Sequence, residues 1–469
     1  MSNQPTTISR RSHALDALRG YAIMTMILSA TEAFNVLPAW MYHAQVPPPN
    51  HIFNPSIYGI TWVDLIFPFF LFSMGAAIPL SLGRQYAKGT SKWKLAWKCV
   101  QRWFKLSFFA IFIIHVFPFM LGYQQEWLRY AIPILAFGLM CLMYIPNPFH
   151  LSQWRERAIK GSAYLVAVIL MLYQPYANGA AFSLTDSDII MLILANVALT
   201  GSLIYLLTIH KPLYRVAIMP FIMAIFMASH TVGSWAAWLM HSSALPWLYQ
   251  LPYQEYLLVI IPGTIAGDWL TIWLSKRHEV SKIVNAKWIA AISITIICSN
   301  VILLFCRALI INLIVSLILI GILYWLLKHP QGDTIYWKKL WLGGSYLLIL
   351  GLCIESYEGG IRKDDVTISY LLVTSGLAFF ALLFFSIICD YFHFKWVSTP
   401  LELVGKNPMI AYVASSMIVI PILILLKLYP FLESMSSSPF TGFLKGIILT
   451  SLTMIVTIAF TQKKYFWKT

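Results

Sequence analysis

Long apolar runs alternate with short polar segments along almost the whole chain, and this pattern predicts membrane-spanning helices. A run of about 20 apolar residues is long enough to cross the hydrocarbon core of a bilayer as a helix. Such runs lie at 14–36, 61–83, 103–122, 127–146, 161–177, 186–209, 214–232, 254–275, 287–306, 308–327, 340–356, 367–389, 406–429 and 441–461. We therefore expect an all-α, polytopic transmembrane helix bundle of about 12–14 spans, folded as one domain over 1–469 without a soluble domain.

Composition and charge support this picture and add an orientation. Of the 469 residues, 59% are hydrophobic and only 11% are charged, whereas soluble proteins carry about 25% charged residues. Most of the 33 lysines and arginines fall in loops on one side of the predicted spans, which the positive-inside rule assigns to the cytoplasm. The basic residues on the other side are Arg129, Arg307, Arg362, Lys363, Lys427 and Lys445.

This distribution predicts that the N- and C-termini are both cytoplasmic and that the loop 37–60 lies on the outer face. It also accounts for the net charge of +15 by membrane topology, so a nucleic-acid partner is not expected. Membrane lipids are the expected surroundings.

A short set of ionisable residues lies inside or at the ends of the apolar runs. Burying an unpaired charge in lipid is expensive, so such residues are candidates for function. They are Asp16, Arg19, Glu32, Asp64, His115, His230, Asp268, Asp390 and Lys406. No spacing among histidines, cysteines and carboxylates indicates a metal site.

Two of the basic positions allow either a structural or an anion-binding interpretation. Arg19 stands three residues after Asp16 on one helix face, which favours a local ion pair or a phosphate contact from the cytoplasmic side. Lys406 and Asn407 precede Pro408, a pattern typical of a helix start. The free N–H groups there would bind an anion or simply begin an interfacial helix.

His51 and Asp64 flank the outer end of the predicted span 61–83. A neutral imidazole acts as a general base near pH 7, and a carboxylate on its other nitrogen fixes the tautomer. The alternative is an interfacial loop histidine together with a helix-capping aspartate. Sequence separation does not prove contact, so both interpretations stay open here.

Four motifs, in order along the chain, carry a resemblance to a known family. They are "LDALRG" at 15–20, "TWVDLIFPFFLFSMGAAIPLSL" at 61–82, "IRKDDVTISY" at 361–370 and "GKNPMIAY" at 405–412. The chain resembles the bacterial relatives of heparan-α-glucosaminide N-acetyltransferase, especially the branch known as DUF5009. The resemblance implies a protein of the bacterial cytoplasmic (inner) membrane. It would move an acetyl group from cytosolic acetyl-CoA to a sugar or amino-sugar acceptor on the outer, periplasmic face.

The resemblance also implies which residues catalyse the transfer. In the family, a histidine in the loop before the "DLIFPF" helix is catalytic, ten residues ahead of the aspartate. Asn54 stands at that spacing here, so His51 would take the role with a three-residue shift, beside Asp64. His43 is the alternative histidine.

Further site residues follow from the resemblance together with the charge pattern. The phosphates of acetyl-CoA, the only expected cofactor, would lie near Arg19, Arg102, Lys406 and Asn407. The segment 361–370 resembles an outer-loop segment of the family, which makes Lys363 and Ser369 candidates for binding the acceptor. The same analogy allows a homodimer.

Two mechanisms and two classes of function stay open at this point. The histidine would either deprotonate the acceptor for direct attack or carry the acetyl group itself. A sugar or peptidoglycan-fragment transporter without acyl transfer fits the many spans and the basic inner face equally well. Binding of acetyl-CoA separates the enzyme from the transporter.

Overall fold

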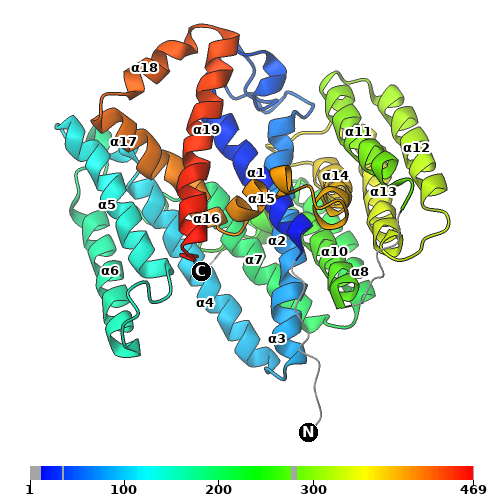
Figure 1. The fold of residues 1–469 in the computed structure, drawn as a ribbon, viewed down its shortest axis with the longest axis horizontal. Coiled ribbons are helices and arrows are strands. Elements are labelled where there is room, and N and C mark those ends of the chain that lie inside the picture. Colours follow the sequence, from blue (N-terminus) through cyan, green and yellow to red (C-terminus); the bar gives the residue numbers. More distant parts are fainter. Residues whose placement is uncertain (1–11, 34–35, 244, 276–282, 468–469) are drawn as a thin grey trace.

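The computed structural model describes residues 12–33, 36–243, 245–275 and 283–467, and this part of the chain is built of helices (Figure 1). The helices lie at α1 His13–Thr31, α2 Trp62–Ile78, α3 Arg84–Ala87, α4 Lys92–His115, α5 Glu126–Tyr144, α6 Gln153–Tyr173, α7 Ile189–Leu207, α8 Pro212–Ser229, α9 Trp235–His241, α10 Leu257–Ser275, α11 Ala286–Phe305, α12 Leu309–Leu326, α13 Thr334–Tyr357, α14 Ile368–Phe385, α15 Lys395–Gly405, α16 Pro408–Ala414, α17 Ile420–Leu425, α18 Tyr429–Ser434 and α19 Pro439–Gln462. The predicted all-α, polytopic bundle is confirmed.

Every predicted apolar run contains a helix, but the number of strongly apolar spans is smaller than predicted. In the described chain, 11 helical segments are long and apolar enough to cross a membrane. Helices α1, α4 and α6 cover the other three predicted runs, and each carries charged residues in its first half. Helix α4 begins at Lys92, well before the predicted 103, because Ser91 caps it by accepting the N–H of Lys94.

The core of the bundle consists of α2, α10 and α14, with α1 and α15 packed beside them (Figure 1). In the Trp62–Ala87 and Ile368–Tyr391 segments, 83% and 89% of the residues in the apolar 18-residue stretch are buried. The corresponding shares are 17% in α8 and 22% in α12. The peripheral helices therefore present their apolar side chains outward, as lipid-facing helices do.

Glycines allow α2 and α10 to approach closely at the centre of this core. A Cβ on Gly263 would lie 2.4 Å from the backbone oxygen of Phe72, and one on Gly267 would lie 2.3 Å from that of Ala76. The spacing of these two glycines thus serves close helix packing, as in other membrane bundles.

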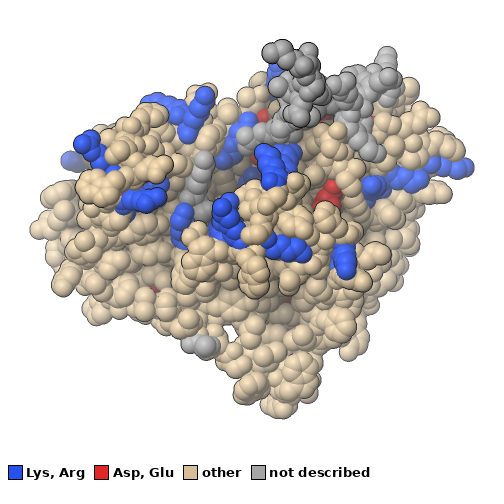
Figure 2. Space-filling model, turned by 90° about the horizontal axis from the view of Figure 1, so that it is seen from below, with Lys and Arg blue, Asp and Glu red and all other residues tan. Residues whose placement is uncertain are grey.

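Helix α1 begins on the side of the bundle where α19 ends, as the charge pattern predicts. In the first turn of α1, His13 Nδ1 lies 2.7 Å from Glu402 of α15. In the last turn of α19, Thr461 donates to the backbone oxygen of Leu403, also in α15, at 3.0 Å. Figure 2 views the molecule from below and shows lysines and arginines spread over this face. We call it the inner side and the opposite face the outer side.

Two core helices continue through π-helical turns. Helix α2 passes through Pro79–Gly83 into α3, and α14 ends in Ser386–Tyr391. Such turns often accompany functional positions in helices. The first borders a cavity described below. The second carries Asp390, whose carboxylate accepts the N–H of His13 at 3.0 Å and so holds the start of α1.

Candidate functional site

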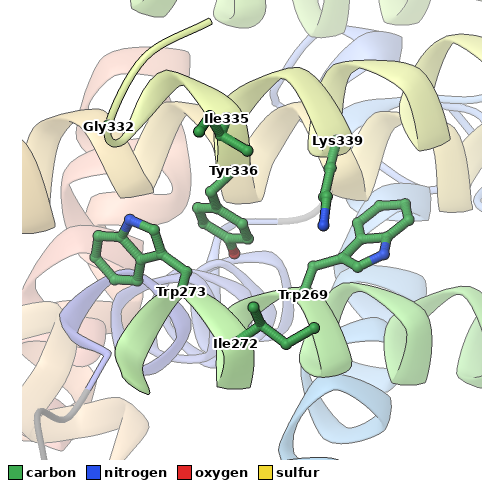
Figure 3. A pocket seen from close by; sticks show the side chains of 7 residues that line it. All are labelled: Trp269, Ile272, Trp273, Gly332, Ile335, Tyr336 and Lys339. Carbon is green, nitrogen blue, oxygen red and sulfur yellow. The ribbon is translucent and has the colours of Figure 1, made fainter. Parts of the chain in front are cut away.

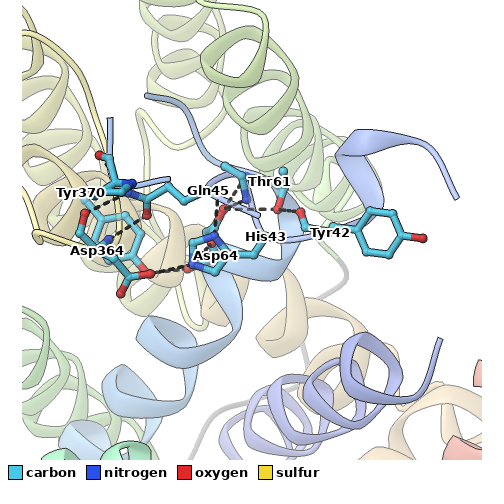
Figure 4. A network of polar contacts seen from close by, with 9 residues as sticks. Tyr42, His43, Gln45, Thr61, Asp64, Asp364 and Tyr370 are labelled. Carbon is cyan, nitrogen blue, oxygen red and sulfur yellow. Dashed lines mark hydrogen bonds and ion pairs between the residues drawn. The ribbon is translucent and has the colours of Figure 1, made fainter. Parts of the chain in front are cut away.

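His43 is the histidine that contacts Asp64 at the outer end of α2 (Figure 4). Its Nε2 lies 3.4 Å from Asp64 Oδ1 and 3.0 Å from Asp364 Oδ2. The sequence predicts His51 as the partner of Asp64, and the structure corrects this, since of these two described histidines it is His43 that makes the contact. The His51 ring packs edge-on against Tyr42, with ring centroids 4.6 Å apart.

The start of α2 explains why His43 reaches this position. Thr61 precedes the helix, and its hydroxyl donates to the backbone oxygen of Tyr42 at 2.8 Å, which draws the neighbouring His43 to the helix start. Asp64 Oδ2 accepts the N–H of Thr61 at 2.9 Å and that of Ala44 at 3.3 Å. Asp64 is therefore a capping residue, at the third helical position of a capping box, and its side chain is 0% exposed.

The backbone fixes the tautomer of the His43 ring. Nδ1 accepts the backbone N–H of Gln45 at 3.0 Å. Because a backbone N–H only donates, Nδ1 carries no proton, and the ring proton sits on Nε2. That N–H faces the carboxylates of Asp64 and Asp364. The ring proton of His43 therefore lies on the side of the two carboxyl groups.

Gln45 joins the outer loop 37–60 to the loop between α13 and α14 (Figure 4). Its amide nitrogen donates to the backbone oxygen of Asp364 at 2.9 Å, and its amide oxygen accepts the Asp364 N–H at 2.9 Å. Gln45 is fully buried, so both bonds are shielded from water. The N–H of Gly59 donates to the backbone oxygen of Ile361 at 2.8 Å and ties the loops a second time.

Asp364 differs from Asp64 in its access to solvent. Its side chain is 42% exposed, on the outer side of the molecule. The imidazole N–H of His43 lowers the pKa of the Asp364 carboxyl below its ordinary value of 3.8, and the charge of Lys363 lowers it further, against the opposing effect of partial burial. The carboxylate is therefore ionised at neutral pH and reachable from the outer solution.

The two residues predicted in this loop for acceptor binding occupy different environments. Lys363 is partly exposed and lies beside Asp364. Ser369 is fully buried at the start of α14, where its N–H donates to Glu358 at 2.9 Å and its hydroxyl to Thr367 at 3.1 Å. Ser369 therefore lies at the start of α14, and its part in acceptor binding stays a prediction.

A second candidate site is a cavity of about 450 Å³ on the inner half of the bundle. Its basic lining residues are Arg19, Lys98 and Arg102, so the predicted pair Arg19 and Arg102 does lie in one cavity. The rest of the lining is mostly apolar and comes from α2, the turn Pro79–Gly83, α3, α4, α7, α16 and the C-terminal segment. These residues are Phe70, Met74, Ala77, Ile78, Ser81, Leu82, Gln85, Cys99, Trp103, Leu106, Leu194, Ala198, Leu199, Ser202, Pro408, Met409 and Trp467.

Arg19 connects three elements at the edge of this cavity. Its guanidinium donates to the backbone oxygens of Ser73 and Gly405, each at 3.4 Å. It also lies 3.6 Å from Asp16 Oδ1, so the predicted local ion pair is confirmed. The side chain is both a structural tie and part of the cavity wall.

Lys406 and Asn407 lie beside the cavity and are not among the residues that line it. Lys406 is 3.7 Å from Glu402. The Asn407 side chain donates to the backbone oxygen of Tyr465 at 2.8 Å and accepts the N–H of Trp467 at 3.4 Å. Lys406 thus contacts α15, Asn407 holds the start of α16 against the C-terminal segment, and anion binding by these two residues stays a prediction.

Helix α2 links the two candidate sites. Phe70, Met74 and Ile78 recur on one helix face along the cavity wall, and Asp64 lies six residues before Phe70. At 1.5 Å per residue, that separation is about 9 Å along the helix axis. The inner cavity thus ends close to the outer cluster along one buried helix.

A smaller cavity of about 40 Å³ lies between α10 and α13, and three of its seven lining residues, Trp269, Trp273 and Tyr336, are aromatic (Figure 3). Trp273 and Tyr336 stack there with ring centroids 5.4 Å apart. Trp273 also donates to Asp333 at 2.9 Å. Tryptophan and tyrosine are enriched where membrane helices meet the headgroup region, and this pocket fits that anchoring role.

Sequence reasoning missed Gln45, Asp364 and Lys98. Gln45 gives no local signal, because the partner that explains it is 319 positions away. Asp364 gave only a weak sequence signal, since it stands inside the motif "IRKDDVTISY" without a known role there. Lys98 gave a usable signal: it stands four residues before Arg102, hence on the same helix face.

The fold and the described sites define an integral membrane protein of the polytopic, all-helical class. Residues 11–270, more than half of the 469-residue chain, match the family model described as "Domain of unknown function (DUF5009)". The chain therefore belongs to this family. A comparison with curated proteins finds no match. The relationship to heparan-α-glucosaminide N-acetyltransferase stays a prediction.

Proposed function

We propose that the protein is a transmembrane acyltransferase. It takes an acetyl group from cytosolic acetyl-CoA and passes it to a sugar or amino-sugar acceptor on the outer side of a bacterial inner membrane. The observation that carries this proposal is the pair of sites along α2, a basic cavity on the inner half and a carboxylate–histidine cluster at the outer end.

The inner cavity suits the donor by charge and by shape. Coenzyme A carries a diphosphate and a third phosphate, and arginine binds phosphate through forked hydrogen bonds while lysine supplies a point charge. Arg19, Lys98 and Arg102 supply these groups at one cavity. The apolar wall along α2 suits the long arm of coenzyme A, which would direct the thioester toward the outer cluster.

The outer cluster suits the proton transfer that the reaction requires. The lone pair of the acceptor amine or hydroxyl attacks the thioester carbonyl carbon, the new C–N or C–O bond forms, and the C–S bond breaks. Coenzyme A leaves as its thiolate, and the proton released by the acceptor goes to the cluster. Both ring nitrogens of His43 are engaged, by Gln45 and by the two carboxylates, which favours direct transfer over an acetyl-histidine intermediate.

The test is acetyl transfer across a sealed membrane. Purified protein is reconstituted in proteoliposomes with acetyl-labelled acetyl-CoA on the cytoplasmic side of the protein and glucosamine on the other. The proposal expects labelled N-acetylglucosamine on the glucosamine side. It is contradicted if no acetyl-CoA is bound or consumed with glucosamine or other sugar acceptors.

The two loop histidines are compared in the same assay. We expect His43→Gln to lower transfer more than His51→Gln, because His43 contacts both carboxylates. The opposite order would return the catalytic role to His51, as the sequence predicts. Full transfer by both variants and by Asp64→Asn would remove the outer cluster from the reaction.

A sugar transporter is the second candidate, favoured by one observation. Arg215 is 1% exposed and pairs with Asp268 at 2.9 Å within the bundle, and charged pairs inside membrane bundles also mark substrate paths. Uptake of labelled sugar into the proteoliposomes without acetyl-CoA would support transport in place of acyl transfer.

A further inference from the structure

We propose that Asp364, and not an imidazole, accepts the proton released by the acceptor, and that His43 positions the Asp364 carboxylate for this step. The assignment rests on the proposed acyl transfer and gives a role to a residue that lies outside the stretch 11–270 matched by the family. Three groups in the cluster compete for the role, and their contacts separate them.

His43 is poorly arranged to receive a proton. Its Nε2 already carries one, because Nδ1 accepts the backbone N–H of Gln45 at 3.0 Å. A second proton would have to enter at Nδ1, where it would replace that hydrogen bond by two N–H groups facing each other. The fixed backbone donor therefore keeps the proton of His43 on Nε2, which lies 3.0 Å from Asp364 Oδ2.

Asp64 is shielded from the acceptor. Its side chain is 0% exposed, and Oδ1 lies 3.4 Å from the His43 ring. Oδ2 accepts the N–H of Thr61 and the N–H of Ala44. Oδ2 is thus occupied by the capping bonds at the start of α2, and the buried Oδ1 faces the His43 ring, so neither oxygen is open to the acceptor.

Asp364 combines access with a fixed position. Its side chain is 42% exposed, and Oδ2 lies 3.0 Å from His43 Nε2. No residue in the described part of the chain bonds its other carboxylate oxygen, which leaves that oxygen for the acceptor. Gln45 holds the Asp364 backbone through two hydrogen bonds of 2.9 Å each. A group held this way reacts without first being ordered.

The loop that carries Asp364 is itself anchored to α14. Glu358 accepts the N–H groups of Ile368 and Ser369 at 2.8 and 2.9 Å, and Thr367 accepts the N–H of Arg362 at 3.1 Å. The carboxylate is therefore presented by a braced turn at the outer end of the core.

The acceptor nitrogen or oxygen attacks the acyl carbon of the thioester, the C–S bond breaks, and the thiolate leaves with the bonding electron pair. The acceptor proton moves to the free carboxylate oxygen of Asp364, which becomes a neutral carboxylic acid. The low pKa of Asp364, caused first by the His43 N–H, returns this proton to the outer solution for the next cycle.

The decisive variants are Asp364→Asn and its neighbour control Asp365→Asn. Both change one carboxylate to an amide, and asparagine tolerates the left-handed backbone of residue 365, whose φ is 44°. In the proteoliposome assay we expect Asp364→Asn to lower the transfer rate about 100-fold, with the KM for acetyl-CoA unchanged, and Asp365→Asn to transfer normally.

His43→Gln separates a positioning donor from a base. Glutamine keeps an N–H that can reach a carboxylate, so we expect only about a tenfold loss, smaller than that of Asp364→Asn. A loss as large as that of Asp364→Asn, in a protein that stays folded in detergent, would make His43 the base and overturn the assignment.

A measurement independent of activity checks the tautomer. The protein is labelled with ¹⁵N-histidine in lipid nanodiscs, and the His43 signals are assigned by their loss in His43→Gln. We expect a protonated Nε2 and an unprotonated Nδ1 at pH 7. A proton on Nδ1, or normal transfer by Asp364→Asn, overturns this assignment alone. Absence of transfer by the unsubstituted protein overturns the proposed function, and the assignment falls with it.

Discussion

The outer cluster and the inner cavity differ in how their polar side chains are arranged. In the outer cluster the polar atoms of His43, Gln45, Asp64 and Asp364 contact one another across two loops and the start of α2. In the inner cavity, Arg19, Lys98 and Arg102 surround about 450 Å³ of space. A preorganised cluster suits catalysis, whereas basic side chains around a cavity suit the binding of a ligand.

This comparison predicts that removing the hydrogen-bonding side chains Asp64 and Gln45, which hold the outer cluster together, lowers stability, and the largest effect should come from Asp64→Ala. It leaves the buried donors at the start of α2 without an acceptor, and we expect the free energy of unfolding to fall by about 3 kcal/mol. Thermal unfolding in detergent measures this. Asp64→Asn keeps one acceptor oxygen and should cost less. Equal, small effects of both would show that the cap contributes little.

Gln45→Ala should have the next largest effect, because it leaves the buried Asp364 N–H and C=O unpaired. We expect a loss of about 2 kcal/mol and faster hydrogen exchange in residues 358–367. The matched control is Gln124→Ala, which removes an exposed glutamine from the segment before α5. If the exchange of this loop is unchanged in Gln45→Ala, the two loops are not held together through Gln45.

The inner cavity should respond in affinity and not in stability. Arg102→Gln removes one phosphate-binding charge, and we expect coenzyme A to bind about tenfold more weakly with the melting temperature unchanged. Lys94→Gln is the control, an exposed charge on α4 that does not line the cavity. Calorimetric titration with coenzyme A measures both, and equal affinities would exclude Arg102 from the donor site.

The smallest effect expected is a pH dependence of the outer loops. The folded pKa of Asp364 lies below its ordinary 3.8, so its stabilising contact is present above that value and is lost as the pH falls through the lower folded value. Hydrogen exchange of residues 358–367 should therefore be insensitive to this group from about pH 5 to 7. It should rise at lower pH, and less so in Asp364→Asn. A transition near neutral pH that disappears in this variant would contradict the assignment.

The same contrast explains what sequence alone could predict. The helices follow from apolar runs and the inner charges from the positive-inside rule, so the bundle and the grouping of Arg19 with Arg102 were both accessible. The choice between His43 and His51 could not be predicted from the sequence. It depends on how the loop 37–60 folds onto Thr61 and onto Asp364, and the second contact joins residues 319 positions apart. Local patterns carry no information on such a pairing.

A structure with coenzyme A bound tests the central claim most directly, that the donor occupies the inner cavity and reaches the outer cluster along α2. The predicted result is a coenzyme with its phosphates at Arg19, Lys98 and Arg102 and its thiol beyond Phe70, directed toward His43 and Asp364. A coenzyme bound elsewhere, or a thiol directed to the inner side, would contradict it.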